Sequence, residues 1–147
     1  MERIVTWWYT FCMEETIFDK IIRREIPAEI IYEDDATIAF LDVTPVHKGH
    51  ALVVPKERCR NILDCSSETV GHVYQIAQKV ALHMKQALNA DGINIHGNNE
   101  PAAGQEVFYF HVHVIPRYET EHPFQKPTHE KYEEGEMKEF AEKLRVG

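Results

Sequence analysis

Cysteine, long apolar runs and internal repeats are scarce or absent in this 147-residue chain. The three cysteines, Cys12, Cys59 and Cys65, are odd in number and form no Cys-x-x-Cys pair. This usage argues against a disulfide framework and a cysteine-based zinc site, and it is typical of a reducing cytoplasm. The apolar stretches are too short to cross a bilayer, and the first residues lack the pattern of a signal peptide. We therefore expect a cytoplasmic protein with no membrane partner.

Basic side chains are also in short supply. Lys and Arg number 16 against 24 Asp and Glu, which gives a net charge of −8. Such a chain is a poor candidate for binding nucleic acid through nonspecific phosphate contacts. Net charge describes only the far field, so a local site for a small phosphorylated ligand stays open. The length and the 44% apolar content predict one domain with a sizeable core.

The spacing of apolar residues predicts three helices. A short helix is expected over 16–24, a long one over 66–88 and a terminal one over 134–144. Ser66 or Ser67 can cap the long helix, and Gly92 suits a left-handed cap at its end.

Strands are expected over five short runs: 30–33, 37–41, 51–54, 93–95 and 107–115. Strands, one long helix and further strands in this order predict an α+β fold with an antiparallel sheet. Before them, the aromatic residues of the arm 1–14 predict a strand or arm that covers apolar surface, or alternatively a dimer contact.

The last predicted strand carries the chemistry. Side chains alternate between the two faces of a strand, so Tyr109, His111 and His113 share one face, opposite the apolar residues between them. Two neighbouring imidazoles, preceded by Gly104 and Gln105, can form a small anion site. Three interpretations stand at this point: solvated histidines, a metal site completed by His50 or Asp42, and a base or nucleophile acting on phosphorus.

Segment 104–117, GQEVFYFHVHVIPR, resembles the signature strand of the histidine triad (HIT) family, His-φ-His-φ-His-φ-φ with φ apolar. Further stretches match in the same order, among them TIFDKII, YEDD, AFLDVTP, KGHALVVPK and Asn98-Asn99. The similarity covers a domain over 15–118, with an extension over 119–147, and it is greatest to the Hint-like branch. It implies a HIT-like fold and a homodimer that joins two sheets. It also implies hydrolysis of nucleoside 5′-phosphoramidates or related nucleotidyl bonds, with AMP- or GMP-type purine ligands and no cofactor.

The resemblance assigns roles to single residues. His111 corresponds to the nucleophile that forms a covalent nucleotidyl-histidine, His113 to a phosphate contact and His50 to a supporting histidine. Asp42 corresponds to the acid that binds the ribose hydroxyls. The base pocket and the α-phosphate site correspond to the remaining positions: Ile17, Phe18, Ile21, Phe40 and Leu41 for the base, and Asn98, Gln105, Glu106 and Val107 for the phosphate.

The chain departs from the family pattern at several positions. Tyr109 replaces the first triad histidine, and we expect its backbone carbonyl still to orient His111. Some relatives bind zinc at the positions of Thr16, Asp19, Arg58 and Tyr109, a set that does not suit zinc, so we expect no metal. Glu100 places a negative charge near the phosphate site.

These departures keep two alternative functions open, a nucleotide-binding protein with little turnover and a dinucleoside polyphosphate hydrolase. The extension beyond the domain is also a candidate to cross to a partner's site.

Overall fold

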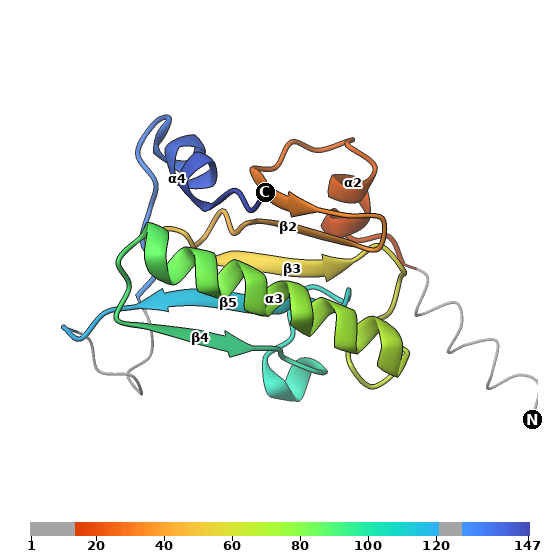
Figure 1. Cartoon of the computed structure of the whole chain (residues 1–147). Coiled ribbons are helices and arrows are strands. Elements are labelled where there is room, and N and C mark those ends of the chain that lie inside the picture. The colour runs from red at the N-terminus through yellow and green to blue at the C-terminus, as the bar shows by residue number, and fades with distance from the viewer. Residues whose placement is uncertain (1–13, 121–127) are drawn as a thin grey trace, which may run out of the picture.

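The computed structural model describes residues 14–120 and 128–147, and the aromatic arm lies almost wholly outside this part. The helices are α2 (Ile17–Ile22), α3 (Ser67–Ala87) and α4 (Glu136–Leu144), with a 3₁₀ turn η1 over Pro101–Ala103. The strands are β1 (Ile30–Glu33), β2 (Thr37–Leu41), β3 (Ala51–Pro55), β4 (Gly92–His96) and β5 (Val112–Arg117). They form one antiparallel sheet, which confirms the predicted sheet type, and their order in it is β1-β2-β3-β5-β4 (Figure 1).

The helix ends follow from local side chains. Thr16 and Asp19 form a capping box at the start of α2, and the hydroxyl of Ser66 accepts from the backbone N–H of Thr69 at the start of α3. The left-handed residue after α3 is Asn89, with φ 50°, and Gly92 is already the first residue of β4. The predicted cap at Gly92 is therefore wrong, because asparagine also tolerates this conformation.

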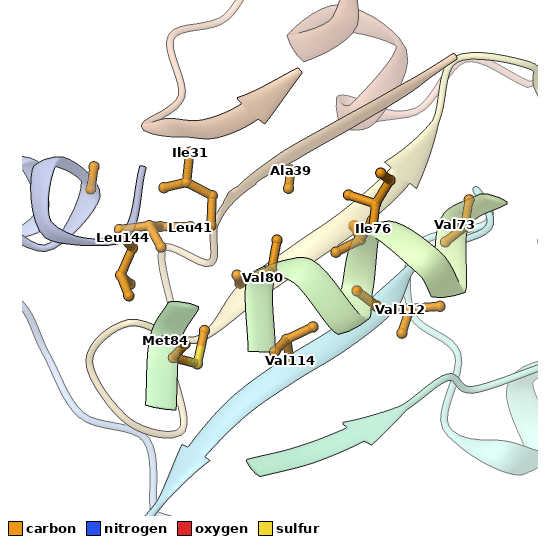
Figure 2. Close-up of a cluster of buried hydrophobic side chains, with 14 of the residues drawn as sticks. Ile31, Ala39, Leu41, Val73, Ile76, Val80, Met84, Val112, Val114 and Leu144 are labelled. Carbon is orange, nitrogen blue, oxygen red and sulfur yellow. The ribbon is translucent and has the colours of Figure 1, made fainter. Parts of the chain in front are cut away.

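The sheet has two covered faces. Helix α3 lies across one face, with α4 beside its C-terminal end, while α2 lies on the opposite face. Figure 2 shows the core under α3, where Val73, Ile76, Val80 and Met84 meet side chains of the strands. These four apolar side chains of α3 are thus buried, whereas a smaller cluster around Phe18, Phe40 and Tyr109 packs under α2.

The predicted start of the last strand is corrected. Strand β5 begins at Val112 and not at Val107, because the N–H of Phe110 donates to the carbonyl of Cys59 (2.8 Å) instead of joining the sheet.

The prediction for the cysteines is also corrected. Cys59 and Cys65 form a disulfide, with Cα atoms 5.2 Å apart. This local bridge differs from the expectation of unpaired cysteines, and a six-residue separation gives no Cys-x-x-Cys signal.

The C-terminal extension folds back onto its own chain. Its described part contacts the loop 42–50 through Glu130, whose N–H donates to the carbonyl of Pro45 (2.9 Å). Near the C-terminus, the N–H of Val146 donates to the carbonyl of Ile31 (2.8 Å) in β1. Residues 128–147 therefore lie against their own domain, while the expected crossing to a partner's site stays a prediction. Among the described residues, no helix is long and apolar enough to span a bilayer.

Candidate active site

A cavity of about 760 Å³ opens on the face of the sheet that carries α2. This is a size typical of small-molecule sites. The register of the strands sets a row of side chains across the cavity floor, because Phe40 pairs with Leu52, Leu52 with His113 and His113 with His96. The predicted site residues all line the cavity except Gln105.

His111 is oriented by the backbone of Tyr109. A carbonyl oxygen can only accept, so the 2.6 Å contact means that Nδ1–H of His111 donates to the carbonyl of Tyr109. In the neutral ring, Nε2 then keeps its lone pair. The ring is 8% exposed and packs edge-on against Phe18 with centroids 5.1 Å apart, yet it lines the cavity. The expectation that the Tyr109 carbonyl orients His111 is confirmed.

His50 and His113 form a second oriented pair. The N–H of Val46 donates to Nδ1 of His50 (3.1 Å), so the proton of the neutral ring lies on Nε2. This Nε2–H donates to Nδ1 of His113, 2.9 Å away. The remaining proton of neutral His113 is then on its own Nε2. The Tyr109 carbonyl thus leaves His111 with an acceptor at Nε2, whereas the Val46 N–H, through His50, leaves His113 with a donor at Nε2.

The three imidazoles are held neutral. Burial lowers the pKa of His50 to about 4, although Asp42 opposes the shift, and it lowers the pKa of His113 to about 3 with the help of neighbouring imidazoles. Burial also lowers the pKa of His111, although the Tyr109 carbonyl opposes the shift. A neutral His111 near pH 7 has the unprotonated nitrogen that a nucleophile needs.

Asp42 lies where β2 ends and faces the same pair. Its Oδ1 accepts from the backbone N–H of Thr44 (2.9 Å), which makes a tight turn, and its Oδ2 lies 3.7 Å from Nε2 of His50. Asp42 is therefore a turn residue and a cavity residue at once.

One wall of the cavity is apolar. Helix α2 contributes Ile17, Phe18 and Ile21, and β2 contributes Phe40 and Leu41. Phe18 and Phe40 pack edge to face with centroids 5.4 Å apart. Phe40 and Ile21 are buried core residues and also line the cavity, so both interpretations of these side chains hold together.

The loop between β4 and β5 forms another rim, where Asn98, Gly104, Glu106 and Val107 line the cavity. Gln105 lies beneath it and is 5% exposed. Its Oε1 accepts from the backbone N–H of Glu100 and its Nε2 donates to the carbonyl of Val107. Both ends of the Gln105 amide are thus occupied within the protein, so its side chain braces this rim.

The carboxylate of Glu100 is paired within the protein. Arg60 donates to both of its oxygens (2.9 and 2.8 Å) and Asn61 donates to one (2.9 Å). These bonds lower the pKa of Glu100 to about 2. Glu100 does not line the cavity, and Arg60 compensates the negative charge that the sequence placed near the phosphate site.

The cavity is also lined by two histidines that the sequence analysis did not select. His96 on β4 stacks on His113 with ring centroids 4.8 Å apart and planes 17° apart. His129 belongs to the C-terminal extension, and its Nδ1 bonds to the carbonyl of Thr44 (2.9 Å). Alternation in β4 could have indicated His96, but nothing near His129 in the sequence points to the site.

The four positions at which some relatives are expected to hold zinc do not suit that ion among the described residues. Where relatives are expected to hold zinc, Asp19 is bound to Thr16 and lies 3.5 Å from Arg58, and the Tyr109 hydroxyl donates to the carbonyl of Pro55 (2.8 Å). Asp42, His50 and His113 also come close together. There the proton on Nε2 of His50 takes the lone pair that a metal would need.

The HIT domain family matches residues 23–120. The protein hit of Bacillus subtilis (strain 168) is 40% identical over 107 residues, 73% of this chain and 74% of that protein. A HIT-like protein of Mesomycoplasma hyorhinis is 48% identical over 105 residues, 71% of this chain and 95% of that protein. The crystal structure of a Hit-like protein from Bartonella henselae, 42% identical, superposes with a TM-score of 0.80 over 89% of this chain and 95% of that chain. On sequence, fold and site geometry together, the chain belongs to the HIT family of nucleotide-binding hydrolases and transferases.

Proposed function

We propose that this protein hydrolyses purine nucleoside 5′-phosphoramidates or related nucleotidyl bonds, as in the Hint-like branch of the family. The observation that carries the proposal is the orientation of His111, whose Nδ1–H is bound to the Tyr109 carbonyl so that Nε2 is left as an unprotonated nucleophile. Nothing in this arrangement requires a side-chain imidazole at position 109.

The reaction proceeds in two displacements. Nε2 of His111 attacks phosphorus and the P–N bond to the amine breaks, while the leaving nitrogen takes a proton from solvent. Water then attacks the nucleotidyl-histidine and gives a proton to solvent, the His111–phosphorus bond breaks, and the nucleoside monophosphate and neutral imidazole are released. His113, with a proton on Nε2, donates a hydrogen bond to the phosphoryl oxygens.

The way in which the nucleoside binds is inferred from the residues that line the cavity. The apolar wall of α2 and β2 takes the planar purine and carries no polar group that reads one base, so AMP- and GMP-type ligands are both accepted. Asp42 accepts hydrogen bonds from the ribose hydroxyls, and Asn98 with the backbone at 106–107 binds the α-phosphate.

The test replaces the nucleophile. In the His111→Asn protein we expect turnover of an aminoalkyl adenosine phosphoramidate to fall about a thousandfold or more, with AMP binding by calorimetry largely kept. The matched control is His83→Asn, because His83 is a half-buried residue of α3 that lies outside the cavity lining and is bound to the carbonyl of Lys143. Rapid acid quench of the wild-type reaction should trap the chain with one nucleotidyl group attached. An unchanged rate in His111→Asn would exclude the mechanism.

A second candidate function is dinucleoside polyphosphate hydrolysis. Beyond His113 the cavity continues along Asn94, His96 and Arg117, a polar region able to contact a larger leaving group. Turnover of diadenosine polyphosphate above that of the phosphoramidate would favour this candidate. Binding of AMP without turnover of either substrate would favour a nucleotide-binding protein.

A further inference from the structure

The turn before His50 is held by side chains from the far end of the chain. We call residues 129–136 the strap. The N–H of Lys48 donates to Oε2 of Glu130 (2.8 Å), and the next N–H, of Gly49, donates to the hydroxyl of Tyr132 (2.7 Å). Two successive backbone donors of the turn thus depend on the strap, and neither has a strand or helix partner.

The backbone of this turn has little room to move at Gly49. Its φ is +99°, and a Cβ at this position would come within 2.6 Å of Cδ1 of Leu88. Its backbone is therefore pressed against the end of α3. A buried N–H that lost its acceptor would be unfavourable, so the Tyr132 hydroxyl is part of what keeps the turn in place. Burial in turn raises the pKa of Tyr132 to about 12, which keeps the phenol protonated.

The turn leads directly to the site. His50 follows Gly49, its N–H donates to the carbonyl of His47 (2.9 Å), and its ring accepts from Val46 in the same loop. If the turn were displaced, the contact between His50 and Nδ1 of His113 would change. The ring nitrogen of His113 that carries the proton would then no longer be fixed.

We propose that Tyr132 is a positioning residue for the reaction at His111, and that it acts through the turn 47–49 and His50 on the tautomer of His113. The proposal rests on the proposed function, because it places Tyr132 in the same reaction. Tyr132 does not line the cavity, so it has no direct route to the substrate. Its ring packs on Phe140 with centroids 5.8 Å apart, which a phenylalanine would preserve.

The experiment compares Tyr132→Phe with Tyr32→Phe, each of which removes one hydroxyl. Tyr32 is a matched control because its hydroxyl donates to Asp34 (2.8 Å) and the residue packs with the α3 core. In Tyr132→Phe we expect kcat for an adenosine phosphoramidate to fall about tenfold, with KM within about twofold, since the base wall is untouched. In ¹⁵N NMR, the ring nitrogens of His50 and His113 should lose their single-tautomer shifts in Tyr132→Phe only.

The proposal is overturned if kcat and the ring-nitrogen shifts of Tyr132→Phe match the wild type, or if Tyr32→Phe lowers kcat equally. Should Tyr132→Phe fail to fold, Glu130→Ala removes the neighbouring acceptor of the turn, and the same measurements decide the matter there. The NMR arm needs no turnover. A wild-type protein without hydrolase activity would refute the proposed function, while the ring tautomers would still decide whether the strap sets them.

Discussion

Tyr109 separates what a backbone contributes to the site from what a side chain contributes. Its carbonyl orients His111, whereas its phenol is 1% exposed and donates to the carbonyls of Pro55 (2.8 Å) and Lys56 (3.2 Å). Burial raises the pKa of this phenol above its usual value, so it takes no part as an acid or base near neutral pH.

The change Tyr109→Phe should therefore affect stability more than rate. The two carbonyls lose a buried donor, and we expect a loss of about 1–2 kcal/mol in the free energy of unfolding. We expect kcat to stay within about threefold, because the carbonyl of residue 109 is unchanged. Urea denaturation and steady-state kinetics check the two parts. A large drop in kcat at normal stability would mean that the phenol itself takes part in the reaction.

The histidines predict a specific acid sensitivity. The folded chain holds the pKa of His50 near 4 and that of His113 near 3, below their ordinary value of 6.5. Between pH 6.5 and these lowered pKa values, the unfolded chain binds more protons than the folded chain. The free energy of unfolding is therefore at its full value above about pH 6.5 and falls as the pH drops toward 4. The loss should be on the order of a few kcal/mol.

Urea midpoints between about pH 7.5 and 4.5 measure this loss, and ordinary carboxylates titrate mostly below that window. In His113→Gln the slope of stability against pH should be shallower. A slope identical to that of the wild type would show that His113 is not responsible. The rate should fall in the same direction, because protonation of His111 removes its nucleophilic lone pair.

At the scale of the elements, the loop between β4 and β5 carries two side-chain amides with different roles. Gln105 holds the loop in place, and Asn98 is available to contact a ligand. Gln105 is bound on both sides within the protein, while Asn98 lines the cavity with one long contact to the carbonyl of Gly104 (3.5 Å). We expect Gln105→Ala to lower the free energy of unfolding by about 2–4 kcal/mol, since it leaves several buried groups unpaired.

Asn98→Ala is the matched comparison. It should weaken AMP binding severalfold and leave stability within about 0.5 kcal/mol. Thermal denaturation and calorimetric titration of both variants test the assignment. If Gln105→Ala kept full stability and lost only AMP binding, Gln105 would be a ligand contact, as the family resemblance suggested.

Regular elements and their faces could be predicted from the sequence because each has a local signal. The helix over 66–88, the two strands on either side of Asp34 and the shared face of His111 and His113 depend on periods of a few residues. The strap leaves no such signal, since Lys48 and Glu130 are 82 residues apart. The true start of β5 was also hidden, because the N–H of Phe110 bonds to Cys59 outside the sheet. Such contacts are specified by tertiary packing, not by local pattern.

At the scale of the whole molecule, β4 is an edge strand that pairs only with β5 among the described residues (Figure 1). Ile95 on this edge is 41% exposed, and Leu82 on α3 is 61% exposed. An edge strand beside exposed apolar groups is suited to pairing with a second copy. We therefore propose, in line with the family resemblance, a homodimer that joins two sheets at β4.

Light scattering after size exclusion should give about twice the chain mass of 17.1 kDa. Ile95→Lys should shift the population toward the monomer, because it places a charge at the joined edge. Lys131→Glu, an exposed change in the strap, serves as the control. A wild-type species of single-chain mass at all concentrations would remove the dimer.

The cavity draws its lining from Ile17, near the start of the described chain, to His129 in the C-terminal extension. A bound nucleotide would therefore tie distant stretches of polypeptide to one another, and a single proteolytic cut that released either end would leave an incomplete binding site. Saturating AMP should slow trypsin digestion at both ends together, so protease resistance would report occupancy even for a ligand that is never turned over.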